Sequence, residues 1–225
     1  MTMAESITTY DTRIRRVFKQ NKLLLVLLCN LPFLSFTLKH DKLLAEYLAK
    51  INLTTCHHFL TIMTYGGDGL IIICPLLLGI LSRYFFKNPA TERVAWFVAI
   101  SIILSGIACI LLKILFGRAR PELWIYHQIY GFYWLQFNPS YWSFPSGHAT
   151  TLMSIAFALS FLYPHKKTLF FVLASPLVIT RILLFQHFLS DIIAATIISF
   201  VETTFLYHYL NNKQFFNTQP FILSR

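Results

Sequence analysis

The chain has 225 residues, of which 56% are hydrophobic and only 12% are charged, and its formal net charge is +10. Soluble domains carry about 25% charged residues, so this composition excludes water-soluble globular, disordered and fibrous proteins and favours a membrane protein. A nucleic-acid-binding protein is also excluded, because the Lys and Arg residues lie in short groups between apolar runs and form no basic face.

Six apolar runs are candidates for membrane spans, since a helix needs about 17–25 mostly apolar residues to cross the hydrocarbon core. In chain order they are Leu23–Leu38, Gly69–Phe86, Val94–Leu112, Ala149–Tyr163, Thr168–Phe185 and Ile192–Tyr209. No small-residue cleavage site follows Leu38, so we expect the first span to be retained. The sequence therefore predicts an all-α protein, with a bundle of six transmembrane helices over residues 23–210, a cytoplasmic segment over residues 1–22 and a cytoplasmic tail over residues 211–225.

The segment between the first two spans has a helical repeat. Its apolar residues recur at helical spacing, namely Leu43, Leu44, Tyr47, Leu48 and Ile51. Charged residues occupy other positions, namely Asp41, Lys42, Glu46 and Lys50. The pattern predicts a short amphipathic helix on the membrane surface or, equally well, a solvated connector helix.

The distribution of positive charge predicts an orientation. Six spans place both termini on the same side, and that side holds 12 of the 19 Lys and Arg residues. Of the seven on the opposite side, four belong to a single cluster, namely Lys113, Arg118, Arg120 and Arg181. The positive-inside rule therefore predicts cytoplasmic termini.

Three groups of polar residues lie at the ends of the predicted spans. They are residues 113–121 after the third span, residues 143–148 before the fourth span, and Arg181, His187 and Asp191 around the junction of the last two spans. Because the helices alternate in direction, six spans bring all three groups to the non-cytoplasmic face. A missing or an additional span between these groups would separate them.

The cluster has the composition of a phosphate site. Four cations face one nearby acid, Asp191, and guanidinium groups bind phosphate oxygens in bidentate fashion. Ser146 and Gly147 begin a predicted helix, whose free N–H groups and positive dipole end favour an anion. We therefore expect a phosphate to bind between these residues.

Two histidines indicate reaction as well as binding. Asp191 follows His187 by four residues, so on one helix its carboxylate can hold one imidazole N–H and leave the other nitrogen as a nucleophile. His148 is a candidate general acid, and after a phosphohistidine forms it can act as the base for water. The cations can neutralise the negative charge of the phosphate oxygens in the transition state, so we expect neither a metal nor another cofactor.

The three motifs, Lys-x6-Arg-Pro, Pro-Ser-Gly-His and Arg-x5-His-x3-Asp, resemble in this order the signature motifs of the type 2 phosphatidic acid phosphatase superfamily. The resemblance implies the roles above for Lys113, Arg120, Arg181, Ser146, Gly147, His148, His187 and Asp191. Thr180 departs from the pattern, because the family usually has Ser before the third-motif Arg. Arg118 fits the Gly-Arg-x-Arg-Pro form of the first motif, either as a phosphate ligand or as a contact to lipid headgroups.

Several other residues have two interpretations. Glu202, inside the sixth span, is interpreted as a structural residue with Arg83 as a conceivable partner. Asp68 either caps a helix or joins the site, with capping favoured, and Glu122 is interpreted as structural. The aromatic run from Trp124 to Trp142 is either an interfacial belt or a cap over the site.

The expected function is a phosphatase of the bacterial inner membrane that removes a terminal phosphate from a lipid phosphate or isoprenoid pyrophosphate at the periplasmic face. Its expected partners are that substrate and membrane lipids, and not nucleic acid. Phosphatidate, phosphatidylglycerol phosphate, undecaprenyl pyrophosphate and lipid A would all present the same anion. The alternatives are a phosphotransferase with a lipid acceptor, a non-catalytic phosphate-binding, lipid-binding or transport protein, and, less favoured, a metal-dependent hydrolase.

Overall fold

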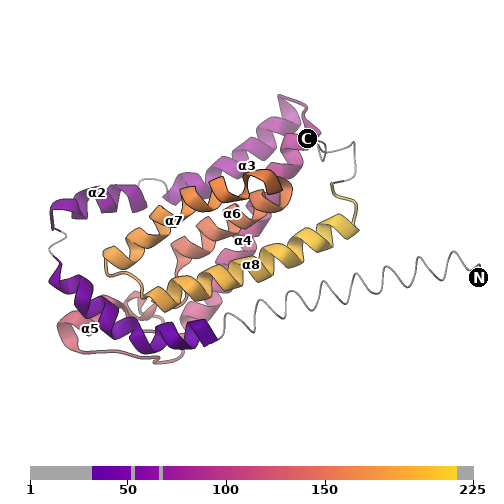
Figure 1. The fold of residues 1–225 in the computed structure, drawn as a ribbon. Helices are drawn as coiled ribbons and strands as arrows, with labels where there is room; N and C mark the ends of the chain where they lie inside the picture. Colours follow the sequence, from indigo (N-terminus) through magenta and orange to yellow (C-terminus); the bar gives the residue numbers. More distant parts are fainter. Residues whose placement is uncertain (1–31, 52–53, 66–67, 217–225) are drawn as a thin grey trace, which may run out of the picture.

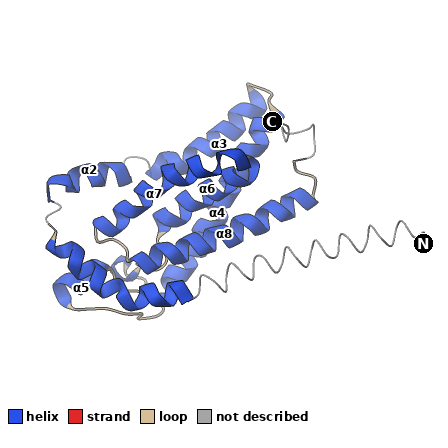
Figure 2. Ribbon diagram, viewed as in Figure 1, coloured by secondary structure: helices blue, strands red, loops and turns tan. Residues whose placement is uncertain are grey.

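The computed structural model describes residues 32–51, 54–65 and 68–216, and the regular structure in these ranges is helical (Figures 1 and 2). A helix over residues 32–50, called helix 32–50 below, is followed by α2 (Thr54–Tyr65), α3 (Asp68–Tyr84), α4 (Pro89–Phe116), α5 (Pro121–His127), α6 (Gly147–Leu162), α7 (Lys167–Leu183) and α8 (Leu189–Asn212). Two short 3-10 helices, η1 (Pro139–Tyr141) and η2 (Pro164–Lys166), lie in the connections. The predicted all-α class is confirmed.

Five of the six predicted spans coincide with helices, namely α3, α4, α6, α7 and α8. Of these, α4 and α8, with 28 and 24 residues, are long and apolar enough to cross a membrane, whereas α6 and the apolar part of α3 are shorter. Residues 1–22, residues 23–31 of the first predicted span, and residues 217–225 of the tail lie outside the described residues. Six crossings therefore stay a prediction.

The segment after the first predicted span differs from the expectation. Helix 32–50 is continuous, so the end of that span and the amphipathic segment belong to one element, and a further helix, α2, precedes α3. Leu43 and Tyr47 are exposed, whereas Asp41 is only 1% exposed. The repeat predicted a helix correctly, but the buried face is the one that carries Asp41.

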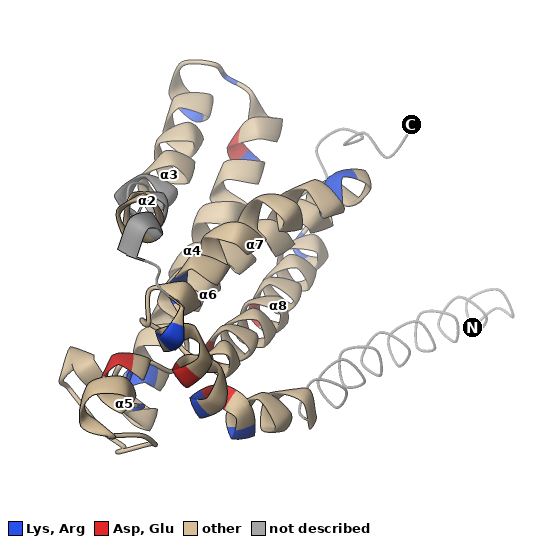
Figure 3. Cartoon of the chain, turned by 60° about the vertical axis from the view of Figure 1, so that its left-hand side comes forward, with Lys and Arg blue, Asp and Glu red and all other residues tan. Residues whose placement is uncertain are grey.

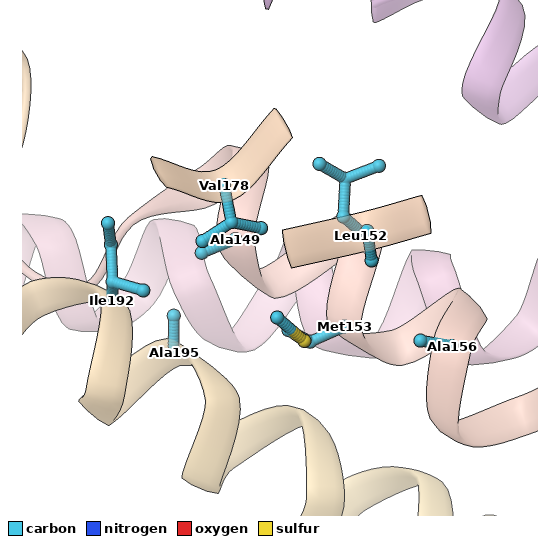
Figure 4. Close-up of a cluster of buried hydrophobic side chains, with 8 residues drawn as sticks. Ala149, Leu152, Met153, Ala156, Val178, Ile192 and Ala195 are labelled. Atoms are coloured by element: carbon cyan, nitrogen blue, oxygen red, sulfur yellow. The ribbon is translucent and has the colours of Figure 1, made fainter. Parts of the chain in front are cut away.

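At the centre of the bundle, α6 packs against α4, α7 and α8 (Figure 1). Its Ala149 and Ala156 belong to a buried cluster with Val178 of α7 and with Ile192 and Ala195 of α8 (Figure 4). Small side chains let helices approach closely, which is typical of membrane bundles. Hydroxyl groups add interhelical bonds, since Ser154 Oγ donates to Ser105 Oγ of α4 at 2.8 Å and Ser199 Oγ of α8 donates to Thr150 O at 2.9 Å.

The outer face of the bundle is apolar. Large hydrophobic side chains are exposed along α3, α4 and α7, for example Leu77, Ile107 and Leu173. In water such a surface is unfavourable by about 25 cal/mol per Å² of apolar area, so its extent fits lipid as the surrounding solvent. Charged residues gather instead at the end of the bundle that carries α5, with others at the α3–α4 turn and the far end of α8 (Figure 3).

Candidate active site

The first motif turns sharply at the end of α4. Gly117 has φ +52°, and its N–H donates to Lys113 O at 3.0 Å. A Cβ atom at this position would lie 2.6 Å from Gln136 Cγ, so both the backbone conformation and the space require glycine. The turn leaves Lys113 in the last turn of α4 and buries Arg118 completely, and Arg120 then precedes α5.

The aromatic run packs onto the end of α4. The backbone N–H groups of Trp134, Leu135 and Gln136 donate to the carbonyl groups of Phe116, Leu115 and Ile114, respectively, at 3.0 to 3.2 Å. These carbonyl groups have no partner within the helix, so the loop satisfies them. Lys113 Nζ donates to Trp142 O at 2.5 Å. These contacts close the end of α4 and hold the first motif in place, whereas the choice between an interfacial belt and a cap over the site stays a prediction.

The second motif begins α6, with Ser146 as its N-cap and Gly147 as its first residue. Ser146 Oγ is buried and has no hydrogen-bond partner within the described residues. A Cβ at Gly147 would lie 3.8 Å from Lys113 Cε, so the Lys113 side chain reaches this helix end. The first N–H groups of a helix, an unused hydroxyl and an ammonium group therefore lie together, and half-buried His148 follows directly.

His187 lies in the turn between α7 and α8 and is 3% exposed. Its Nδ1 is 2.7 Å from Ser143 O. Because a carbonyl oxygen only accepts, Nδ1 carries the proton and Nε2 has a free lone pair. Burial lowers the pKa of His187 well below its usual value of 6.5, and the positive charges of Lys113, Arg181 and Arg120 lower it further. The imidazole is therefore neutral at pH 7 and is surrounded by three of the predicted phosphate ligands.

Asp191 does not hold the imidazole directly, contrary to our prediction from the spacing of the two residues. Its Oδ2 is 3.9 Å from His187 Nδ1, too far for a hydrogen bond, and accepts instead from Ser143 Oγ at 2.6 Å and from Phe188 N at 2.8 Å. The physical reason is that α8 begins only at Leu189, so His187 precedes the helix and the expected helical register does not apply. Asp191 fixes Ser143, and the Ser143 carbonyl fixes His187.

Arg118 lies between two carboxylates. Its Nη2 is 2.8 Å from Asp41 Oδ2, and its Nη1 donates to Asp191 Oδ1. Ser190 Oγ accepts a further bond from Nη1 at 2.6 Å. Burial alone would lower the pKa of Arg118, but the carboxylates of Asp191 and Asp41 raise it above its usual value. This geometry favours a structural role for Arg118 over the phosphate and headgroup contacts that we considered.

Sequence reasoning missed Asp41, because it counted Asp191 as the one acid near the cluster. A signal was present in the sequence. Asp41, Leu44 and Leu48 are spaced by three and four residues, so they share one stripe of a helix, and Ala45 of the same face is buried. The acid therefore faces the bundle.

Other residues that the sequence singled out lie elsewhere, namely Arg83, Glu202, Asp68 and Glu122. Arg83 pairs with Glu92 at 3.3 Å rather than with Glu202, whose Oε2 is buried without a hydrogen-bond partner in the described part of the chain. Asp68 is the first residue of α3, and Glu122 is exposed in the first turn of α5. Arg120 donates to Gln186 Oε1, which ties the first motif to the α7–α8 turn.

Fold and site together define an all-helical protein that holds a neutral histidine among cations at one end of an apolar bundle. Residues 94–215 match the model of the PAP2 superfamily, and since this is more than half of the chain, the protein belongs to that superfamily. The resemblance seen in the three motifs is thus confirmed. All three motifs fall inside the matched residues, whereas Asp41 lies outside them.

Two curated proteins are similar to this chain. One is a lipid A 1-phosphatase of Rhizobium johnstonii, 30% identical over 140 residues, which cover 58% of this chain and 57% of the relative. The other is a lipid A 1-phosphatase of Rhizobium etli, 31% identical over 144 residues, which cover 59% of this chain and 62% of the relative. The chain therefore spans less than two thirds of the length of each relative. No solved structure matches it.

Proposed function

We propose that this protein is a membrane phosphatase that removes a terminal phosphate from a lipid phosphate or isoprenoid pyrophosphate through a phosphohistidine. The observation that carries the proposal is the buried, neutral His187, with its Nε2 lone pair, among the cations Lys113, Arg120 and Arg181. Membership of the PAP2 superfamily supports phosphate chemistry. The names of the two similar proteins and the apolar outer face of the bundle support a lipid as the carrier of that phosphate.

The first step of the proposed reaction forms a bond between His187 Nε2 and phosphorus. The phosphorus–oxygen bond to the leaving group breaks, and His148 gives its proton to the leaving oxygen. Lys113, Arg120 and Arg181 neutralise charge on the other phosphate oxygens, together with the first N–H groups of α6. These fixed positive groups supply the charge stabilisation for which other phosphatases use a metal, so the proposal includes no metal.

The second step returns the enzyme to its starting state. Water attacks phosphorus, His148 takes the proton from the water, and the bond to His187 Nε2 breaks to release inorganic phosphate. Throughout both steps the Ser143 carbonyl keeps the proton of His187 on Nδ1, and Asp191 keeps Ser143 in place. A phosphotransferase would share the first step and differ only in the acceptor of the second.

We propose in addition that the chain crosses the bacterial inner membrane six times, with cytoplasmic termini and a periplasmic site. The excess of Lys and Arg on the terminal side supports this orientation. The gathering of charged residues at the end of the bundle that carries α5 supports a site at the membrane boundary, where a lipid can enter from the side (Figure 3).

Phosphate release by the purified full-length chain in detergent tests the function. We expect release of inorganic phosphate from at least one of phosphatidate, phosphatidylglycerol phosphate, undecaprenyl pyrophosphate and lipid A, unchanged by EDTA and inhibited by vanadate. A folded His187→Ala variant loses turnover, whereas Glu92→Gln, which alters the distant ion pair with Arg83, keeps it. Full turnover in His187→Ala would overturn the mechanism. Loss of activity in EDTA would overturn metal independence. Transfer of labelled phosphate to a lipid would show that the protein is a phosphotransferase and not a hydrolase.

A further inference from the structure

Helix 32–50 forms one wall behind the proposed nucleophile. Its Leu44, Ala45 and Leu48 line a narrow space of about 10 Å³, and His187 and Phe188 line the same space from the α7–α8 turn. A space of this size holds one water molecule at most, so the helix packs closely against the turn. Because the match to the PAP2 superfamily begins at residue 94, this wall comes from a part of the chain outside the family match.

The helix supplies a cap for the start of α8. The N-cap residue of α8 is Phe188, whose side chain has no hydrogen-bond acceptor. Asp41 takes over that role from another helix, since its Oδ1 accepts from Ser190 N at 3.2 Å and its Oδ2 accepts from Ser190 Oγ. A carboxylate at this place satisfies an N–H group that the helix leaves without a partner and compensates the helix dipole.

The same carboxylate balances the charge of Arg118. Asp41 and Arg118 are both buried, and their ion pair at 2.8 Å connects helix 32–50 to the first motif. Arg118 in turn contacts Asp191, which fixes Ser143. Removing one partner of a buried ion pair leaves the other charge uncompensated, so the group of side chains rearranges when Asp41 is changed.

We propose that Asp41 is a positioning residue for the nucleophile, which acts through the first turn of α8 and through Arg118 to hold His187 in line with the phosphorus atom. The inference rests on the proposed function, because its effect on kcat can be measured only if the protein is a phosphatase. It assigns to helix 32–50 a part in the reaction that the three motifs do not contain.

The test uses the full-length chain with Asp41→Asn, and Glu46→Gln as the matched control. Glu46 is an exposed carboxylate of the same helix that accepts from Trp124 Nε1 at 3.1 Å. Turnover of a lipid phosphate from the panel above is measured in mixed micelles below the melting temperature of each variant. We expect Asp41→Asn to lower kcat by about 10- to 100-fold, the cost of a misplaced nucleophile, with KM within about threefold of the starting value. Glu46→Gln changes neither.

Vanadate binding by calorimetry provides a readout that needs no turnover. Since vanadate bound to His187 imitates the transition state, Asp41→Asn should weaken its binding by a factor similar to the loss in kcat. If Asp41→Asn does not fold, Ser190→Ala takes its place, since it removes a hydroxyl between Asp41 and Arg118 and keeps the backbone cap. We expect it to lower kcat and vanadate affinity in the same direction by a smaller factor. Unchanged kcat and vanadate affinity in a folded Asp41→Asn variant would overturn the inference. Absence of turnover in the unaltered protein would overturn the proposed function, and vanadate binding would still decide the role of Asp41.

Discussion

At the scale of single residues, the protonation state of His187 is set by its surroundings. The Ser143 carbonyl selects the tautomer, and burial together with three cations keeps the ring neutral. The same cations are the groups that would bind the phosphate. One arrangement of charge therefore serves both binding and activation of the nucleophile, because positive charge attracts the anion and opposes protonation of the ring.

This arrangement predicts a pH dependence. A nucleophilic imidazole must be neutral, and the lowered pKa of His187 places the acid limb of the kcat/KM profile below pH 6.5. Arg181→Gln removes one of the charges that disfavour the imidazolium form, so it raises the pKa of His187 and moves the acid limb to higher pH. Arg83→Gln, far from the site, leaves the limb in place. An acid limb that does not move in Arg181→Gln would contradict the electrostatic argument.

At the scale of elements, the site depends on how helices begin and end. The end of α4 is closed by Gly117 and the aromatic run, and the start of α8 is capped by Asp41 from helix 32–50. The long helices correspond to the apolar runs that are candidates for membrane spans, and for this reason the sequence predicts α3, α4, α6, α7 and α8. The missed α2 and α5 are short, with 12 and 7 residues, and neither has the length of a span.

Two glycines of the α4 region provide a matched pair of stability predictions. Gly117→Ala places a Cβ in a left-handed conformation and 2.6 Å from Gln136 Cγ, so we expect a loss of about 1–3 kcal/mol in the free energy of unfolding. Gly106→Ala lies inside α4, with no atom within 4 Å of the new Cβ, and should stabilise the protein by about 0.5–1 kcal/mol. Thermal unfolding in one detergent measures both. Equal effects of the two changes would show that Gly117 is not needed for the turn.

At the scale of the whole molecule, the apolar surface and the position of the charges determine how the protein is placed in its surroundings. The exposed hydrophobic side chains along α3, α4 and α7 need lipid, and the charged end with α5 needs the membrane boundary (Figure 3). With the site proposed at this boundary, a lipid headgroup can reach it without the lipid chains leaving the membrane. The proposed orientation places this end in the periplasm.

Cysteine labelling in intact cells tests that orientation. In a variant without the native cysteines, Tyr126→Cys on exposed α5 should react with a membrane-impermeant maleimide, because α5 lies at the site end. Lys213→Cys, directly after α8, should react only after the cells are broken open. Labelling of Lys213→Cys and protection of Tyr126→Cys in intact cells would reverse the orientation. Labelling of both would require an even number of crossings between them, instead of the proposed three.

The sequence by itself determined the all-α class, the three motifs and the anion chemistry, because composition and short-range spacing are sufficient for these. Only the tertiary structure decided that Ser143 rather than Asp191 holds the imidazole, and that Arg118 is buried between Asp41 and Asp191. Asp41 and Ser190 are 149 positions apart in the chain, and their contact arises from the packing of helix 32–50 against the start of α8. Local patterns carry no information on which distant side chains meet, because that depends on how whole helices bury their faces against one another.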